Sequence, residues 1–328
     1  MITDIVIGLQ RGDEGKGKVT HHLLKSGEYT HCIRYSGGCN AGHTIYHKGK
    51  KFVTHLLPAG IFHGVRSIIG NGCVIRVDKL QEEIETFEAA GFDIRNNLRI
   101  ARNAHIVTVD HVSEDSTDTR IGTTRTGNGP AYRSKYGRTG IRAEDVRALK
   151  PYIVDMIDEL HSHPSPVILM EGAQGFWLDP DWGDYPYVTS GHTGVASALQ
   201  NGVSPRSLRD VWGVAKVYET YVGANNFQPK ISIFEDIQRI GQEFGATTGR
   251  TRQCNWIDCS QLTKAINVNG VNKLVINKMD VLREAGTWGV RNPNIILDGG
   301  EEEMMKRIRS VCPSVVENVY YSDSPEKI

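Results

Sequence analysis

The sequence predicts an α/β fold: a single large domain, residues 1–328, around a mostly parallel, twisted sheet. Short apolar runs rich in β-branched residues alternate along the chain with polar loops and helical patterns, which is typical of a parallel sheet covered by helices. Most of these runs lack a polar face, as expected for strands buried on both sides. No internal repeat or low-complexity linker divides the chain. We therefore expect a phosphate-binding loop after the first strand and long loops that carry the site.

The individual elements follow from local pattern. The expected strands are residues 4–9, 67–75, 97–101, 165–172, 210–218 and 272–280. Helices are expected where apolar residues recur at steps of three and four, at residues 77–91, 143–162 and 301–311. A further helix is expected over 17–27, because Gly27 suits a helix end.

Composition excludes several classes of protein. The 39% hydrophobic content indicates a globular protein, and Lys+Arg and Asp+Glu are both 38. This balance argues against a dedicated nucleic-acid coat, because partners must be held by local charge. The first ten residues do not resemble a targeting signal, and no apolar run approaches membrane-spanning length. We expect a cytoplasmic protein without a membrane partner.

The six cysteines are scattered without a C-x-x-C pair. This spacing indicates neither a disulfide framework nor a zinc site. We expect structural thiols.

The stretch GLQRGDEGKGKVT, residues 8–20, resembles a phosphate-binding loop. The spacing G-x-x-x-x-G-K is met by Gly12, Gly17 and Lys18, but Val19 stands where a hydroxyl would hold magnesium. Between a strand and a helix, its backbone N–H groups would hold phosphate oxygens, with Lys16 and Lys18 neutralising charge. The alternative is a glycine-rich turn without a ligand.

Two acids in this loop favour a functional interpretation. Asp13 and Glu14 lie where anions should bind, and an unpaired carboxylate about 4 Å from a phosphate charge is repelled by roughly 4 kcal/mol. Asp13 is therefore expected to bind a metal, take a proton, or do both. Glu14 could instead be a first-turn helix residue favoured by the helix dipole.

The motif NKMD, Asn277 to Asp280, follows an apolar strand. A planar carboxylate such as Asp280 fits the adjacent N1–H and 2-amino donors of guanine, which predicts GTP over ATP. The alternative is that Asp280 caps a helix beginning at Val281.

Three further loops are rich in glycine and polar residues. GGCNAGHT presents Asn40 and His43, and the loop that begins EGAQG offers Gln174, Thr189 and Ser190. The third, GATTGRTR, presents two hydroxyls and two guanidiniums, which suit a carboxylate or a phosphate. Taken singly, His43 could be a satisfied loop histidine and Arg252 a solvated surface charge.

Together these motifs resemble the adenylosuccinate synthetase family, ligases that join L-aspartate to a purine nucleotide. The resemblance runs from residue 5 to about residue 285 and rests on GDEGKGK, NAGHT, GTTRTGNGPAY, EGAQG, YPYVTS, EFGATTGRTR and NKMD, in the family's order. The tail motif SDSPEK would correspond to the family's final nucleotide-contacting loop. In length the chain is similar to the archaeal members and to phage relatives that make 2-aminodeoxyadenylosuccinate.

The resemblance implies a mechanism. GTP would phosphorylate O6 of a purine monophosphate, and the aspartate amine would displace that phosphate at C6. Asp13 would remove the N1 proton and, with the backbone carbonyl of Gly42, ligate Mg²⁺. His43 would stabilise the transferring phosphoryl group and assist as general acid, Lys16 would serve the phosphates, and Gln174 with Asn40 would orient the purine and the attacked oxygen. The other expected donor-nucleotide residues are Gly12, Glu14, Gly15, Gly17, Lys18, Thr44, Asn277, Lys278 and Asp280.

The remaining implied residues bind the two other substrates. Thr124 and Thr189 would hold the 5′-phosphate, and Arg138 would reach that phosphate in the partner subunit of a homodimer. The loop ATTGRTR would bind aspartate, and the expected substrate residues there and nearby are Asn128, Val222, Thr247, Thr248, Arg250 and Arg252.

Several departures from the family bear on the substrate. Arg11 stands where the family commonly has Trp, and Asn128 replaces a usual Ile, whereas the catalytic Asp13 that some phage enzymes lose is retained. Asn128 could accept the 2-amino group of a guanine, so the preferred hypothesis is (d)GMP as substrate, in a host cytoplasm if the source is viral. The alternatives are IMP and, from another class, a guanine-nucleotide switch. ATP or dATP could replace GTP as donor.

Overall fold

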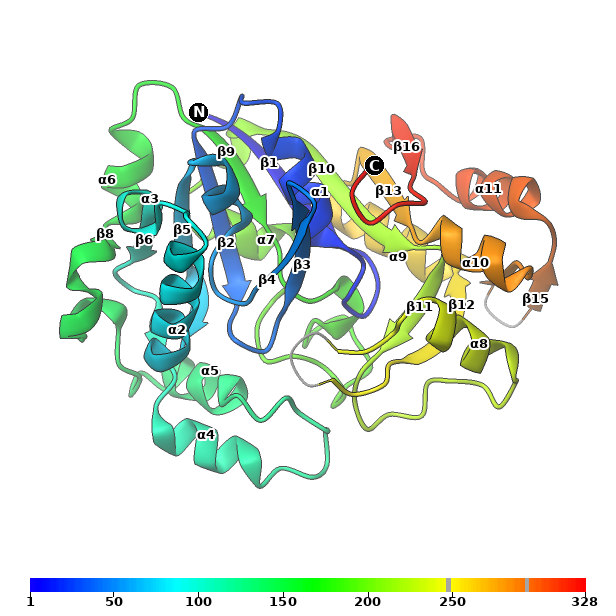
Figure 1. The fold of residues 1–328 in the computed structure, drawn as a ribbon, viewed down its shortest axis with the longest axis horizontal. Helices are drawn as coiled ribbons and strands as arrows, with labels where there is room; N and C mark the ends of the chain where they lie inside the picture. The colour runs from blue at the N-terminus through cyan, green and yellow to red at the C-terminus, as the bar shows by residue number, and fades with distance from the viewer. Residues whose placement is uncertain (246–248, 293–294) are drawn as a thin grey trace.

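A ten-stranded sheet forms the centre of the molecule (Figure 1). The structure is a computed structural model that describes residues 1–245, 249–292 and 295–328. Neighbouring strands of this sheet pair in parallel. From one edge to the other they are β16 (Asn318–Tyr321), β13 (Lys273–Asn277), β10 (Leu208–Lys216), β1 (Ile2–Gly8), β9 (Val167–Glu171), β2 (His31–Gly37), β5 (Arg66–Ile75), β6 (Leu98–Ala101) and β8 (Ile153–Val154), with β7 (His105–Ile106) also paired to β5.

Two smaller sheets flank the large one. The first has the order β11 (Tyr218–Tyr221), β12 (Gln253–Asp258), β14 (Gly289–Asn292) and β15 (Ile295–Asp298). The second is an antiparallel hairpin of β3 (His43–His47) and β4 (Lys50–Thr54).

Helices cover both faces of the large sheet. They are α1 (Lys16–Leu24), α2 (Val77–Ala89), α3 (Ile94–Asn97), α4 (Val109–Ser116), α5 (Asn128–Tyr136), α6 (Met156–His161), α7 (Val195–Leu199), α8 (Ile233–Ile240), α9 (Cys259–Asn269), α10 (Met279–Ala285) and α11 (Glu301–Ser310). The 3₁₀ turns among the described residues are η1 (Ala59–His63), η2 (Ala143–Asp145), η3 (Arg147–Tyr152), η4 (Phe176–Leu178) and η5 (Pro205–Ser207). No helix among the described residues is both long and apolar enough to cross a membrane.

Each face of the large sheet has its own hydrophobic core. Ile5 and Ile7 of β1 pack into a cluster that includes residues of α7, α9 and α11, whereas Val6 packs into a cluster with α1 and α2. Successive side chains of a strand point to opposite faces. The strand is therefore buried on both sides, as its continuous apolar run predicts.

The six predicted strands are confirmed as β1, β5, β6, β9, β10 and β13, and the helices predicted at 77–91 and 301–311 as α2 and α11. Gly27 has a φ of 71° and follows the end of α1. All six cysteines are free, and five of them are buried, in agreement with structural thiols.

The helix predicted over 143–162 is wrong. That segment forms η2, η3 and the short strand β8 before α6 begins at Met156. Pro151 lies inside η3 and is incompatible with a continuing α-helix, because it lacks an N–H donor and restricts the residue before it. Asp155 then caps α6 by accepting hydrogen bonds from the backbone N–H groups of Ile157 and Asp158. Apolar residues recur at helical spacing throughout this segment, although Pro151 and the Asp155 cap interrupt the helix.

The parallel arrangement decides where a site can form. Five adjacent strands, β13, β10, β1, β9 and β2, run in the same direction, so their carboxyl ends meet along one edge. Ligands of open α/β sheets bind at this edge. The glycine-rich loop, GGCNAGHT, EGAQG and NKMD follow four of these strands.

Candidate active site

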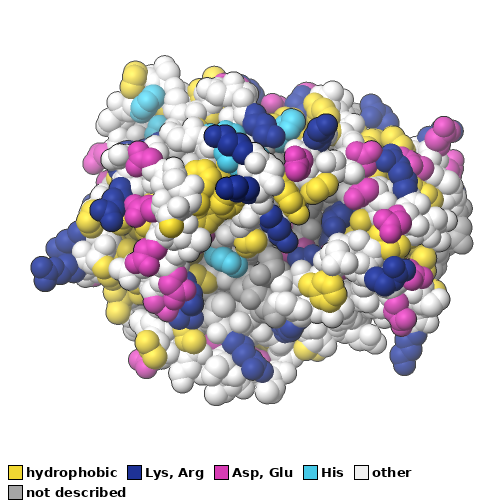
Figure 2. Space-filling view, in the orientation of Figure 1, with side chains coloured by type: hydrophobic (Ala, Val, Ile, Leu, Met, Phe, Trp, Pro, Cys, Tyr) yellow, Lys and Arg dark blue, Asp and Glu magenta, His cyan; other side chains and the backbone are white. Residues whose placement is uncertain are grey.

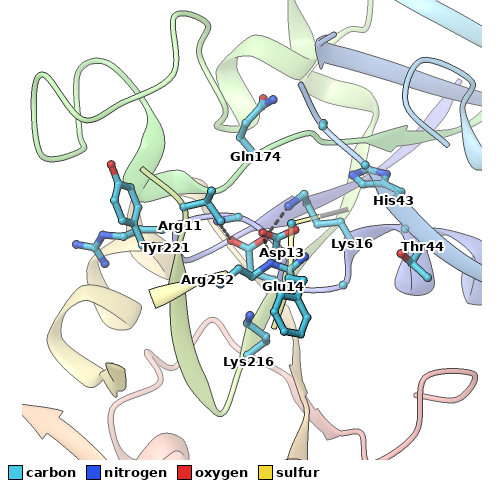
Figure 3. A pocket seen from close by; sticks show the side chains of 18 of the residues that line it. Arg11, Asp13, Glu14, Lys16, His43, Thr44, Gln174, Lys216, Tyr221 and Arg252 are labelled. Carbon is cyan, nitrogen blue, oxygen red and sulfur yellow. Dashed lines mark hydrogen bonds and ion pairs between the residues drawn. The ribbon is translucent and has the colours of Figure 1, made fainter. Parts of the chain in front are cut away.

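A cavity of about 680 Å³ opens at the carboxyl edge of the large sheet. On the space-filling surface a hollow lies near the centre of one face, with Lys and Arg side chains around it (Figure 2). The residues that line the cavity come from every loop singled out by the sequence (Figure 3).

The phosphate loop, residues 9–15, is built around a buried carboxylate. Glu14 is fully buried and accepts hydrogen bonds from the backbone N–H groups of Gln10, at 3.2 Å, and Gly12, at 2.8 Å. A Cβ atom at Gly8 or Gly175 would lie 2.5 or 2.3 Å from a Glu14 oxygen, so both positions need glycine. Glu14 therefore fixes the conformation of the loop through hydrogen bonds from inside it, a role that the sequence did not identify. Helix α1 begins at Lys16, so Glu14 is not a residue of its first turn, as the alternative interpretation had it.

The two lysines of the loop have different partners. The Lys16 amine lies 2.6 Å from a Glu14 oxygen, and both side chains are buried. The Lys18 amine instead donates to Ser322 Oγ, at 2.7 Å, and to the carbonyl of Ser324, at 3.0 Å. Both lysines line the cavity, so the expectation that they neutralise phosphate stays a prediction. Lys18 also joins helix α1 to the C-terminal segment.

Asp13 faces the cavity from a strained backbone position. Its φ is 60°, a left-handed value that costs a non-glycine residue free energy and often marks a functional site. Its carboxylate oxygen Oδ2 lies 2.8 Å from Arg252 Nε. Oxygen ligands suit Mg²⁺, and Asp13 lines the same cavity as Gly42, the other expected metal-binding residue.

A second buried carboxylate, Glu243, organises the cations behind Asp13. It is fully buried and lies 2.5 Å from Arg252 Nη1, 3.4 Å from Lys216 Nζ and 3.8 Å from Lys278 Nζ. Burial alone would raise its pKa, but the charges of Lys216, Lys278 and Arg252 hold the pKa at about 2. Glu243 therefore stays ionised and connects Arg252 to Lys278.

A third buried carboxylate, Glu171, holds His43. Its Oε1 atom is 2.5 Å from His43 Nδ1, and its Oε2 atom accepts from the backbone N–H of Ala59 at 2.7 Å. Burial, and then the charge of Arg34, lower the pKa of His43. Burial alone would raise the pKa of Glu171, but the hydrogen bond from His43 and the nearby charges bring it below the usual value. The resting pair is thus a carboxylate and a neutral imidazole whose Nδ1–H donates to Glu171.

Asn40 and Gln174 lie side by side in the cavity wall. Gln174 Nε2 donates to Asn40 Oδ1 at 3.0 Å, and Asn40 Oδ1 also accepts from the backbone N–H of Gly38. Gln174 has a φ of 53°, a second strained residue of the cavity. The two amides come from loops after β2 and β9, and the structure brings them together as expected.

The wall near Asn128 carries a chain of hydroxyl and amide groups. Thr124 and Thr126 hydroxyls are 3.0 Å apart, and the Thr126 hydroxyl donates to Asn128 Oδ1 at 3.4 Å. Asn128 is buried at the first position of α5, and its Nδ2 atom has no hydrogen-bond partner among the described residues. The unpartnered atom of Asn128 is therefore an amide donor, which suits an anion such as phosphate.

The residues expected to bind guanine lie at the other end of the cavity. Asn277 ties β13 to the phosphate loop, because its Nδ2 atom donates to the carbonyl of Glu14 at 2.7 Å. Asp280 is exposed in the first turn of α10, which begins at Met279, so it is not the cap of a helix starting at Val281. Ser324 and Pro325 also line the cavity, where the tail motif SDSPEK was expected.

The other expected residues divide into two groups. Those that line the cavity are Gly12, Gly15, Gly17, Thr44, Thr189, Val222 and Arg250, together with Lys278. Arg138 is exposed and does not line the cavity of its own chain. Thr247 and Thr248 lie outside the described residues. The sequence did not single out Glu171, Glu243, Lys216 or Arg34, although Glu171 begins EGAQG and Glu243 begins EFGATTGRTR.

Comparison with known proteins identifies the family. The sequence profile of adenylosuccinate synthetase matches residues 5–148 and 145–292. The chain belongs to the adenylosuccinate synthetase family. It is 38% identical to the adenylosuccinate synthetase of Thermodesulfovibrio yellowstonii, over 86% of this chain and 78% of that protein. It is also 38% identical to the enzyme of Chlorobium phaeovibrioides, over 94% of this chain and 84% of that protein.

Solved structures agree. The fully ligated adenylosuccinate synthetase from Plasmodium falciparum superposes with a TM-score of 0.86 at 27% identity, over 98% of this chain and 97% of that one. The cyanophage S-2L succinoaminodeoxyadenylate synthetase shares the fold, with a TM-score of 0.78 at 22% identity, over 99% of this chain and 93% of that one.

As an adenylosuccinate synthetase homologue, the chain is a ligase that forms a C–N bond. Enzymes of the family act on a purine nucleoside monophosphate and aspartate, and they use GTP and Mg²⁺. Residues expected to bind each of these ligands line one cavity.

Proposed function

We propose that this chain couples GTP to the joining of L-aspartate and IMP. O6 of IMP attacks the γ-phosphorus of GTP, GDP leaves, and the N1 proton passes to Asp13. The amine of aspartate then attacks C6, and the phosphate leaves with O6 to give adenylosuccinate.

The observation that carries this proposal is the position of Asp13. A carboxylate held in the left-handed region at the tip of a phosphate loop lies in one cavity with Lys16, His43 and Gln174. A neutral amide oxygen attacks phosphorus poorly. A base beside the phosphate site removes the N1 proton and so makes O6 more nucleophilic, which positioning alone does not do. Guanine-nucleotide switches need no such base next to a second nucleotide pocket.

Asp13 and the Gly42 carbonyl would hold Mg²⁺, which neutralises phosphate charge when bound. Asp13 first has to leave Arg252, its partner at 2.8 Å. Arg252 and Arg250 lie at the same cavity and suit the carboxylates of L-aspartate. We infer that Arg252 moves from Asp13 to the substrate when aspartate binds.

His43 would contact the transferring phosphoryl group through Nε2, since Nδ1 is engaged by Glu171. Glu171 supplies the negative charge that makes an imidazolium possible in a buried site. A phosphate that approaches Nε2 also raises the pKa of His43, because its negative charge favours the imidazolium. His43 can thus take up a proton as the substrates bind and release it to the departing oxygen.

The preference for IMP over (d)GMP follows from Asn128. The sequence hypothesis needs this residue as an acceptor for a 2-amino group, but its Oδ1 already accepts from Thr126 and its free atom is a donor. We therefore assign Asn128, with Thr124, Thr126 and Thr189, to the 5′-phosphate. The 36–38% identity to several bacterial adenylosuccinate synthetases also favours IMP.

A second candidate is (d)GMP with the same chemistry. It is favoured by the fold shared with the cyanophage S-2L enzyme, whose structure is bound to dGMP and to dATP as energy donor. That comparison also keeps dATP and ATP as alternative donors, whereas Asp280 in the guanine end of the cavity favours GTP.

The assembly and location expected from the sequence stay predictions. Arg138 is exposed and does not line the cavity of its own chain, which is compatible with an arginine donated across a homodimer. We propose that dimerisation completes the 5′-phosphate site, and that the enzyme works in the cytoplasm.

The test uses purified protein with L-aspartate and Mg-GTP, together with IMP, GMP or dGMP, and products identified by mass. We expect adenylosuccinate from IMP, with phosphate released only when aspartate and the purine nucleotide are both present. Turnover of dGMP without IMP turnover would establish the second candidate. Phosphate release from GTP alone, without any ligated product, would contradict the proposed reaction.

A further inference from the structure

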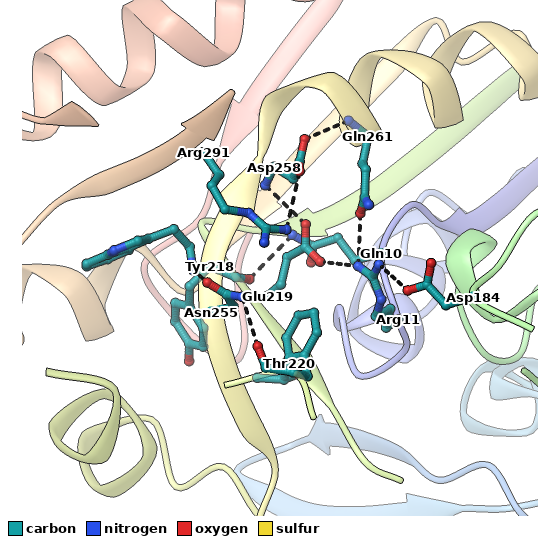
Figure 4. Close-up of polar contacts among 12 residues, drawn as sticks. Gln10, Arg11, Asp184, Tyr218, Glu219, Thr220, Asn255, Asp258, Gln261 and Arg291 are labelled. Carbon is teal, nitrogen blue, oxygen red and sulfur yellow. Dashed lines mark hydrogen bonds and ion pairs between the residues drawn. The ribbon is translucent and has the colours of Figure 1, made fainter. Parts of the chain in front are cut away.

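Arg11, directly before Gly12 and Asp13, joins four segments that are far apart in the sequence (Figure 4). Its Nη1 atom donates to Glu219 Oε2 at 2.6 Å and to Gln261 Oε1 at 2.9 Å. Its Nη2 atom donates to Asp184 Oδ2 at 3.0 Å, and the guanidinium lies 5.0 Å from the centre of the Phe227 ring. Arg11 is only 7% exposed.

Two of these segments carry residues of the purine monophosphate site. Asp184 lies in the connection of residues 179–194, between η4 and α7, which also holds Thr189. Phe227 lies in the connection after β11 that begins at Val222, and Gln253 fixes it by accepting from the backbone N–H of Phe227 at 2.8 Å. Both connections are long and irregular, so their placement depends on contacts such as these.

The other two contacts anchor the guanidinium. Glu219 is fully buried on β11, and its second oxygen accepts from the backbone N–H of Asp258 at 3.1 Å. Gln261 lies in the first turn of α9, where its own backbone N–H donates to Asp258. Glu219 and Gln261 thus fix the buried side of the Arg11 guanidinium, and the guanidinium in turn holds the half-exposed Asp184.

We propose that Arg11 is a positioning residue for the purine monophosphate: it ties the connection carrying Thr189 to the phosphate loop that ends in Asp13. The tie keeps the 5′-phosphate contacts in register with the base that deprotonates N1. Loss of the tie weakens binding of the purine nucleotide and leaves binding of GTP and aspartate unchanged, because neither Asp184 nor Thr189 is expected to contact them. This inference rests on the proposed function, whereas the tie itself rests on the contacts of Arg11.

The most informative variant is Asp184→Asn. The Asp184 side chain is 54% exposed, so its replacement should not impair folding. Asp184 also does not line the cavity, so any effect on substrate binding is indirect. The matched control is Asp181→Asn on the same connection, where the carboxylate is 70% exposed and 3.8 Å from His192. For a half-exposed ion pair we expect the KM for the purine monophosphate to rise about two- to fivefold in Asp184→Asn. The kcat and the KM values for GTP and aspartate should match wild type in both variants.

Hydrogen exchange gives a readout that needs no turnover. Amides of residues 180–193 should exchange faster in Asp184→Asn than in wild type or Asp181→Asn, because local opening becomes easier. The difference should shrink in high salt, which screens the wild-type pair. Equal exchange in all three proteins, or a rise in all three KM values together, would overturn the inference. If residues 180–193 exchange faster only in Asp184→Asn, but the wild-type protein turns over no purine monophosphate, the proposed function fails while the structural tie through Arg11 is supported.

Discussion

At the scale of single residues, buried carboxylates hold the basic side chains of the site. Glu14 holds Lys16, Glu171 holds His43, and Glu243 holds Arg252. A buried carboxylate is stable only when it is paired or hydrogen-bonded, so each pair fixes both partners. The chemistry of the cavity therefore depends in part on Glu171 and Glu243, which do not line it.

Asp13→Asn should separate binding from chemistry. The amide keeps the size of the side chain but cannot take the N1 proton, so kcat should fall by about 10²-fold or more. The Kd for GTP, measured by calorimetry, should change little, because Lys16 and the backbone N–H groups remain. Asp236→Asn, at an exposed pair with Arg239 on α8, is the control. Near-normal turnover in Asp13→Asn would refute the role of base.

Glu171→Gln should alter the protonation of His43. Its amide oxygen can still accept from Nδ1–H, but the charge that raises the pKa of His43 is lost. We expect kcat to fall and the alkaline limb of the kcat–pH profile to move to lower pH, since the protonated imidazole is the acid. In a His43→Asn background the same change should have no further effect. Additive losses in the double variant would show that Glu171 acts through another group.

At the scale of elements, strands were predicted better than helices and connections. A buried parallel strand is a continuous apolar run, which identified β1, β5, β6, β9, β10 and β13 without tertiary information. The hairpin of β3 and β4 was missed, because its residues mix charge with aromatic rings and carry no clear alternation. The helix expected over 143–162 failed because Pro151 and the Asp155 cap divide a pattern that still has helical spacing.

Helix α1 and the C-terminal segment form one unit through Lys18. Its amine has three oxygen acceptors, on Ser322, Ser324 and Lys327, and Ser324 lines the same cavity as Asp280, which is expected to bind guanine. Lys18→Met should loosen this segment and raise the KM for GTP several-fold, while the KM for the purine monophosphate stays constant. The control is Lys25→Met at the end of the same helix. A selective loss of purine monophosphate binding would contradict this assignment.

The same unit should respond to pH. Burial lowers the pKa of Lys18 to about 8, and the neutral amine has two N–H donors for three acceptors. The KM for GTP should therefore rise as the pH passes about 8 in wild type. In Lys18→Met that dependence should be absent.

At the scale of the whole molecule, the sequence predicted the sheet, its functional edge and most of the cavity residues. Motifs after successive parallel strands must meet at one edge, so Asp13, Asn40, Gln174 and Asn277 could be placed together without a structure. The partners of these residues could not. Glu243 meets Lys216 and Lys278 only because α8 and its following turn fold back onto the ends of β10 and β13, which no local pattern encodes.

The stability of the molecule should decline in mild acid. His21 and His63 are hydrogen-bonded neighbours in contact with His47, and burial lowers the pKa of His21 to about 3 and of His63 to about 4. The unfolded chain binds protons at these sites below about pH 6.5, and the folded chain does not until about pH 4. The free energy of unfolding should therefore fall as the pH drops from about 6.5 to about 4, seen as a lower Tm at pH 5 than at pH 7.

The variant His63→Gln should reduce this pH dependence, because one neutral histidine is removed from the cluster. His161→Gln is the control, since His161 is exposed and bonds only to the Gly202 carbonyl among the contacts described. An unchanged Tm between pH 7 and pH 5 in wild type would contradict the prediction.

The enclosure of Glu14 by two glycines also restricts how this gene can drift. A methyl group at Gly8 would overlap the carboxylate, whereas one at Gly175 would also lie 2.3 Å from the Gln10 carbonyl oxygen and 2.6 Å from the Gly12 backbone nitrogen. A shorter acid at position 14 would therefore make room for a methyl group at Gly8 but not at Gly175. Lineages that differ at Gly8 are expected to differ at Glu14 as well, and to keep Gly175.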